Sequence, residues 1–66
     1  MKSTIYVVTV EFGDEYYTYS VEVAYAGNDY DAALKNAAEH TGKSVQNIQI
    51  EFWEDGEMVK CSNFAP

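Results

Sequence analysis

The chain of 66 residues contains no arginine, one cysteine, one histidine and one proline. A single cysteine excludes a disulfide within the chain, and one cysteine with one histidine is too few for the Cys/His clusters that hold structural zinc. With only four lysines and no arginine, the chain also lacks the basic stripe that neutralises nucleic-acid phosphates. We therefore expect no metal, no other cofactor and no direct binding to nucleic acid.

The sequence also lacks an apolar run of about 18 residues, the minimum for a bilayer-spanning helix. Residues 5–12 are mostly apolar, but Tyr6, Thr9 and Glu11 interrupt them and no small-residue cleavage site follows, so we do not interpret them as a secretory leader. Acidic proteins are repelled by anionic membrane surfaces. Together with the lone cysteine, these features predict a cytoplasmic protein that does not bind membranes.

Eleven acidic residues oppose the four lysines, which gives a formal net charge of −7. Disordered chains combine high charge with few apolar residues, whereas 47% of this chain is hydrophobic. The length allows one domain, residues 1–66. Chains of about 60 residues bury only roughly 60% of their unfolded surface, so we expect a thin core.

Two β-strands are predicted at residues 4–12 and 16–25, because both segments are rich in β-branched and aromatic residues and Gly13-Asp14 separates them. Alternation with a period of two assigns one apolar row to each strand. These rows are Tyr6, Val8, Val10 and Phe12 in the first strand, and Tyr17, Tyr19, Val21 and Val23 in the second. A two-residue turn would pair Val8 with Tyr19 and Val10 with Tyr17, which puts both rows on the same face.

A helix is predicted after residues 26–29, with Asn28 or Asp29 as its N-cap and Gly42 as its stop. Residues at helical spacing predict its buried stripe. They are Tyr30, Ala33, Leu34, Ala37, Ala38 and Thr41. Because most of the stripe is alanine, we expect the helix to lie close to the sheet.

A second hairpin is predicted from residue 45 onward, because Asp55-Gly56 is a strong signal for a two-residue turn. Alternation puts Ile48, Ile50 and Phe52 on the inner face. The turn predicts two inner pairs, Phe52 with Val59 and Ile50 with Cys61, and two outer pairs, Trp53 with Met58 and Glu51 with Lys60. We expect residues 63–66 to be a frayed tail.

These elements predict an α+β fold of ββαββ order, in which one helix packs on a mostly antiparallel sheet of three to four strands. Two strand orders satisfy the pattern. One is 2-1-3-4 with antiparallel neighbours, and the other is the 2-1-4-3 order of β-grasp domains with parallel pairing at the centre.

No motif predicts an enzyme. Gly42-Lys43-Ser44 resembles the end of a phosphate loop, but Ala37 stands where that loop needs glycine and a helix precedes it instead of a strand. Cys61 is predicted to be a buried hydrophobe, and His40 is predicted to cap the helix or face solvent. Acid–base catalysis by the paired carboxylates would require an enclosing pocket, for which so small a domain offers little room.

The outer sheet face mixes apolar and aromatic residues with carboxylates. The predicted alternation gives it twelve residues: Ile5, Val7, Thr9, Glu11, Tyr16, Thr18, Glu22, Gln49, Glu51, Trp53, Met58 and Lys60. One-sided antiparallel sheets normally have a more polar outer face, and contiguous exposed apolar surface often marks an interface. The alternative is ordinary cross-strand pairing by residues of high β-propensity.

A short, acidic, arginine-free and tyrosine-rich chain with strands around one helix resembles the small inhibitors that bacteriophages make. Anti-CRISPR proteins are one such group. The small phage inhibitor of bacterial RNA polymerase is similar to the layout of Ser3–Gln49, which has two strands, an alanine-rich helix and a third strand. The resemblance implies a stoichiometric blocker of a nucleic-acid machine in the host cytoplasm, whose clustered carboxylates imitate phosphates.

We therefore expect a protein-binding module whose partner is a host protein with a basic surface. Trp53 is the predicted anchor, because large aromatic residues often dominate binding energy. The full set of predicted partner-binding residues is Trp53, Glu51, Glu54, Asp55, Glu57, Met58, Tyr16 and Glu11. The alternative is an assembly module that forms a homodimer through its open sheet face or a sheet edge.

Overall fold

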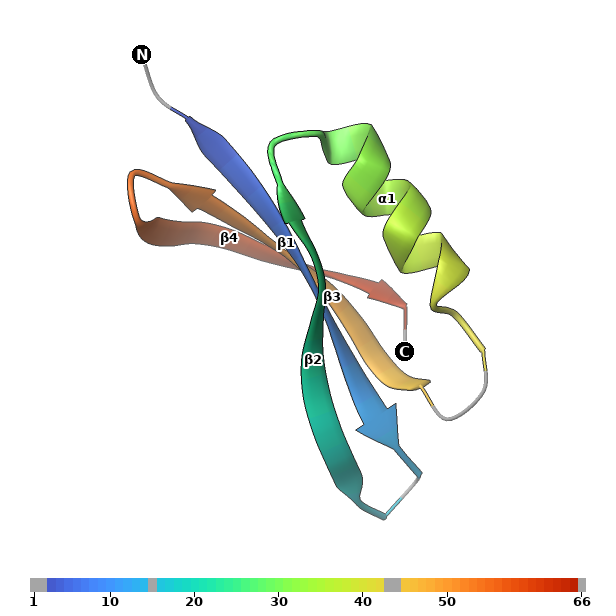
Figure 1. Cartoon of the computed structure of the whole chain (residues 1–66). Coiled ribbons are helices and arrows are strands. Elements are labelled where there is room, and N and C mark those ends of the chain that lie inside the picture. The colour runs from blue at the N-terminus through green and yellow to red at the C-terminus, as the bar shows by residue number, and fades with distance from the viewer. Residues whose placement is uncertain (1–2, 15, 43–44, 66) are drawn as a thin grey trace.

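The computed structural model describes residues 3–14, 16–42 and 45–65, without the side chains of Thr18, Tyr19 and Ala65. Its elements are β1 (Thr4–Gly13), β2 (Thr18–Gly27), α1 (Tyr30–Glu39), β3 (Val45–Glu54) and β4 (Glu57–Ala65). This is the predicted ββαββ order of an α+β fold. The helix lies on one face of the sheet (Figure 1).

The four strands form one antiparallel sheet in the order β2-β1-β3-β4. Of the two predicted strand orders, the structure has the fully antiparallel one. Each hairpin contributes a central strand and an edge strand, and β1 meets β3 over nearly its whole length, from Thr4 opposite Glu54 to Phe12 opposite Val45. The molecule is elongated, with extents of 43 × 21 × 15 Å.

Six buried apolar residues form the core between the sheet and α1. They are Val8, Val10, Ala33, Ala37, Ile48 and Ile50. Val8 is opposite Ile50 and Val10 is opposite Ile48, so the central strands present a patch of four branched side chains to the helix. The two alanines let the helix lie close to this patch. The predicted inner faces of β1 and β3 are confirmed.

The helix begins and ends at polar caps. The Asp29 carboxylate accepts a hydrogen bond from the Ala32 N–H at 3.1 Å, and His40 Nδ1 lies 2.8 Å from the Asn36 carbonyl oxygen. Gly42 has a φ of +131°, a positive value that favours glycine. Of the two predicted N-caps the structure has Asp29, and the predicted capping position of His40 is confirmed. The prediction that Gly42 stops the helix is wrong, because the helix ends at Glu39 and Gly42 lies two residues beyond its cap.

The predicted buried stripe of the helix is partly wrong. Ala33 and Ala37 are buried and Leu34 packs against the core as expected, and the Tyr30 ring, although 41% exposed, packs on Tyr6 and Phe52. Ala38 and Thr41 are exposed. Thr41 follows the end of the helix, and Ala38 lies about 100° around the axis from Ala37. The sheet therefore covers a narrower strip of helix than the sequence pattern predicted.

The loop of the first hairpin is longer than the predicted two residues. The Asp14 carboxylate accepts the N–H groups of Tyr16 and Tyr17 at 2.8 and 2.9 Å, and Gly13 is opposite Thr18. Asp14 thus organises a four-residue loop, as Asp side chains often do in turns. The predicted two-residue turn is wrong.

This loop, together with an extra residue at Ala24, changes the register of β2. Val8 is opposite Tyr25 and Val10 is opposite Glu22, whereas Tyr19 and Tyr17 had been predicted in those positions. Val21 and Val23 consequently lie on the face opposite the helix, 58% and 64% exposed. The predicted inner row of β2 is wrong at Val21, Val23 and the loop residue Tyr17, and the side chain of Tyr19 lies outside the described residues.

The second hairpin has the predicted turn, with Asp55 at φ +52° and Gly56 at φ +82°. Positive φ at both central residues is typical of a type I′ turn. Trp53 is opposite Met58, which confirms that pair.

Beyond the turn, Val59 is an extra residue without a partner in β3. Phe52 is therefore opposite Lys60 and Glu51 is opposite Cys61. The predicted pairs Phe52–Val59, Ile50–Cys61 and Glu51–Lys60 are wrong, because one inserted residue exchanges the two faces of a strand. Cys61 is exposed instead of buried.

Residues near the C-terminus are paired and not frayed as predicted. Asn63 is opposite Gln49 and Ala65 is opposite Ile48, and the Gln49 side chain donates a hydrogen bond to Asn63 Oδ1 at 3.2 Å. These pairs extend β4 alongside β3 to Ala65, so the prediction of a frayed tail from residue 63 is wrong.

Candidate protein-binding surface

The sheet face opposite α1, which we call the open face, collects side chains from all four strands. Its residues are Ile5, Val7, Thr9, Glu11, Val21, Val23, Ala26, Asn47, Gln49, Glu51, Trp53, Met58, Cys61 and Asn63. The helix contacts the other side of β1, β2 and β3. Within the described part of the chain, no element covers the open face (Figure 1).

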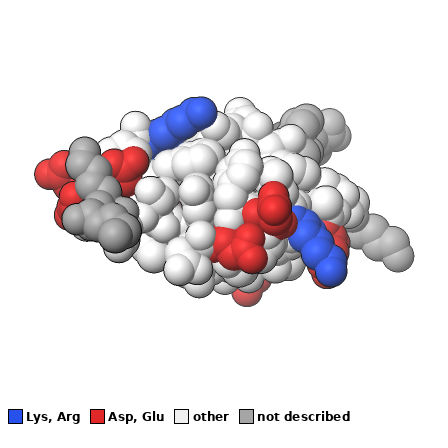
Figure 2. Space-filling model, turned by 90° about the horizontal axis from the view of Figure 1, so that it is seen from above, with Lys and Arg blue, Asp and Glu red and all other residues white. Residues whose placement is uncertain are grey.

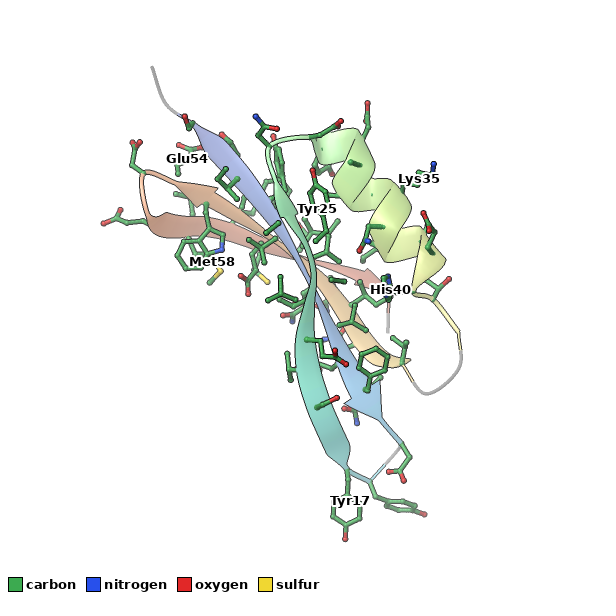
Figure 3. All side chains as sticks on the ribbon, in the orientation of Figure 1. Tyr17, Tyr25, Lys35, His40, Glu54 and Met58 are labelled. Atoms are coloured by element: carbon green, nitrogen blue, oxygen red, sulfur yellow. The ribbon has the colours of Figure 1, made fainter. Side chains whose placement is uncertain are left out.

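One end of the open face, which we call the Trp53 end, lies beside the β3–β4 turn. It consists of Ile5, Glu51, Trp53 and Met58 together with the turn carboxylates Glu54, Asp55 and Glu57. Trp53 lies between Ile5 and Met58 in one cross-strand row, and its Nε1–H donates a hydrogen bond to Glu51 Oε1 at 3.0 Å. Figure 3 shows Met58 and Glu54 at this end. Of the four carboxylates, Glu51 shares the face of Trp53 and Asp55 lies in the turn. Glu54 and Glu57 are opposite each other in the row of Thr4, which alternation places on the helix side.

Lysine is absent from the described part of the open face. Of the two lysines that the structure describes, Lys35 is on the helix and Lys60 is on the helix side of β4, with its Nζ 5.1 Å from the centre of the Phe52 ring. The extra residue Val59 put Lys60 there. Figure 2 shows carboxylates gathered at the left end of the molecule, where the β3–β4 turn lies in Figure 1.

The structure brings together six of the eight predicted partner-binding residues. They are Glu51, Trp53, Glu54, Asp55, Glu57 and Met58. Glu11 is on the open face but six residues along β1 from Ile5, about 20 Å at the usual rise per residue. Tyr16 lies in the β1–β2 loop, which is at the opposite end of the sheet; Figure 3 labels the neighbouring Tyr17 there.

The prediction missed six open-face positions, namely Val21, Val23, Ala26, Asn47, Cys61 and Asn63. Asp14 was a signal for a longer first loop, because Asp side chains accept backbone N–H groups a few residues on, but that loop changes the register of β2 only together with the bulges. No sequence pattern indicated those bulges, because any residue can occupy the extra position.

The described residues do not enclose a cavity for a substrate or a metal ion. They form no pocket, and no group of three or more His, Cys, Asp or Glu side chains among them is placed to hold a metal ion. Thr41 and Gly42 follow a helix, as expected, while Lys43 and Ser44 of the phosphate-loop resemblance lie outside the described residues. What the described surface presents is an open, acidic and partly apolar face.

Comparison of the chain with protein-family models, with curated proteins and with solved structures gives no match. In the part of the chain that the structure describes, no helix has the length and apolar character needed to cross a membrane.

Proposed function

We propose that this chain is a small protein-binding module that acts as a stoichiometric inhibitor, of the kind that bacteriophages make. Its partner is a host protein, and it occupies the basic surface through which that protein binds nucleic acid. The observation that carries this proposal is the open face, where Trp53 lies beside the Glu51 carboxylate with no described lysine on that face, next to a hairpin tip that carries Glu54, Asp55 and Glu57.

Electrostatics favour a basic protein as the partner. A net charge of −7 on so small a chain attracts cationic surfaces over distances of about a Debye length, ~10 Å at 0.1 M salt. Part of this charge is concentrated at one end of the sheet, by Glu51 beside Trp53 and by Glu54, Asp55 and Glu57 at the adjoining hairpin tip. Such a surface accelerates association with a basic groove and repels nucleic acid.

The competing function is assembly by homodimerisation. Exposed Val21 and Val23 and the two edge strands β2 and β4 favour it. Contact between two open faces, however, would bring Glu11 and Glu51 of both copies together without a described lysine to neutralise them. Because like charges across an interface are costly, the charge distribution favours a basic partner over a second copy.

The proposal is tested with a panel of purified bacterial DNA- and RNA-binding proteins in a biosensor assay, at low and high salt and with duplex DNA as competitor. We expect one or more panel members to bind in competition with DNA and to release at high salt. Trp53→Ala should mainly speed dissociation, and Glu54→Lys with Asp55→Lys should mainly slow association.

Glu22→Lys with Glu39→Lys is the matched control, because it makes the same change in charge at two exposed carboxylates away from the open face, one on the helix side of β2 and one on the helix. An equal effect of the two double charge reversals would contradict the assigned surface. A dimer that persists at high salt in sedimentation analysis, with no binding to the panel, would support the assembly function instead.

A further inference from the structure

Glu51 is a carboxylate held among apolar neighbours. On the open face it lies between Val7 and Cys61 in its cross-strand row, and Trp53 follows two residues later on the same face. Glu51 is only partly exposed. The hydrogen bond from Trp53 Nε1–H to Glu51 Oε1, 3.0 Å long, fixes both side chains relative to each other.

This arrangement leaves the Glu51 carboxylate able to accept further hydrogen bonds. A carboxylate has about four acceptor sites, and the indole N–H occupies one of them. No described lysine lies on this face to supply a counter-ion. A carboxylate in such surroundings favours a cation that donates several hydrogen bonds to it.

The indole of Trp53 adds a second preference for the kind of cation that binds. Its only polar atom already has a partner, so what the indole still offers is its ring. Tryptophan is the aromatic side chain that binds cations most strongly. A planar guanidinium can stack on an indole and also donate paired hydrogen bonds to a carboxylate, whereas the compact ammonium of lysine matches the charge alone.

We propose that the Trp53–Glu51 pair recognises arginine side chains of the partner in preference to lysine. The inference rests on the proposed function, because it specifies the chemistry of the basic surface that the Trp53 end would contact. The pair is preorganised: β3 is a central strand between β1 and β4, and the hydrogen bond exists without a partner. Little conformational entropy is therefore lost on binding.

Trp53 is the only tryptophan of the chain, so intrinsic fluorescence reports on this site directly. We would titrate the protein at physiological salt with two blocked peptides, one of eight arginines and one of eight lysines. The arginine peptide should bind about tenfold more tightly, the factor that roughly 1.4 kcal/mol of stacking and paired hydrogen bonding supplies.

Two variants with the same charge change separate this site from general electrostatics. In Glu51→Gln the arginine peptide should lose its advantage, since the amide keeps an acceptor for the indole but not the charge. In Glu57→Gln, which alters the exposed turn, both peptides should weaken equally and the advantage should remain. Circular dichroism checks that both variants are folded.

The outcomes distinguish the inference from the function on which it rests. Equal affinity of the two peptides for the unmodified protein, or an arginine advantage that survives in Glu51→Gln, would overturn the inference and leave the acidic binding surface in place. If neither peptide bound, the proposed function would fail, and the inference with it.

Discussion

At the scale of single residues, Val59 determines the charge of the open face. As an extra residue in β4 it turns Lys60 toward Phe52 and the helix side, and it turns Cys61 outward opposite Glu51. Without this bulge Lys60 would be opposite Glu51 and would neutralise it. One inserted position thus removes a cation from the surface that we assign to a basic partner.

The outward position of Cys61 is directly testable. Because the thiol is exposed, it should react completely with Ellman's reagent in the native protein, with no denaturant present. Thiols in a packed core react only when the protein opens. Cys61→Ser provides the blank, and a reaction that required urea would show that Cys61 faces the core and that the bulge at Val59 is misplaced.

At the scale of elements, the β3–β4 hairpin carries the Trp53 end and depends on its turn. Asp55 and Gly56 both have positive φ, so the turn follows the twist of the two strands. Trp53 and Met58 pair directly before and after it. The backbone conformation of Asp55 and Gly56 therefore sets the distance between the turn carboxylates and the Trp53 indole.

Replacement of Gly56 by alanine tests this dependence. No atom lies within 4 Å of the added Cβ, so the cost comes from the positive φ of +82° alone and should be about 1 kcal/mol. For a domain of this size, that lowers the melting temperature by roughly 4–8 °C. Asp55→Asn is the control, since asparagine tolerates positive φ, and its melting temperature should equal that of the unmodified protein. A melting temperature of Gly56→Ala equal to that of the unmodified protein would contradict the turn geometry.

At the scale of the whole molecule, six buried residues support a sheet about 30 Å long, the length of ten strand residues. The helix packs on β1, β2 and β3. The described part of the molecule is therefore an extended sheet stabilised at its middle, and among the described elements none covers the face opposite the helix. This shape provides a long contact surface at the expense of core volume.

Such a core should be sensitive to small deletions. Ile48 is fully buried, and Ile→Ala typically costs about 2–5 kcal/mol, a large share of the roughly 3–10 kcal/mol expected for a chain of this length. Ile48→Val should cost about 0.5–1.5 kcal/mol and remain folded. Val23→Ala, on the open face, should cost less than about 0.5 kcal/mol. Urea unfolding measures all three, and equal losses at Ile48 and Val23 would contradict the assigned faces.

Much of the candidate site was predictable because it is local. Glu51, Trp53, Glu54, Asp55, Glu57 and Met58 lie within eight consecutive residues, and the Asp55-Gly56 turn fixes how they meet. Glu11 and Tyr16 had been predicted because alternation put them on the same outer face as Trp53. The antiparallel order places the β1–β2 loop at the opposite end of the sheet, so Tyr16 is far from Trp53 and Glu11 is about 20 Å along β1 from Ile5.

The sequence alone determined the ββαββ order, a helix N-cap at Asn28 or Asp29, the Asp55-Gly56 turn and the inner faces of β1 and β3. Each of these depends on a residue's own backbone preference or on uninterrupted alternation with its neighbours. Only the tertiary structure decided the strand order, the register of β2 and the sides of Lys60 and Cys61. These depend on pairing between distant segments and on extra residues such as Val59, whose place is set by the fit of whole strands against one another.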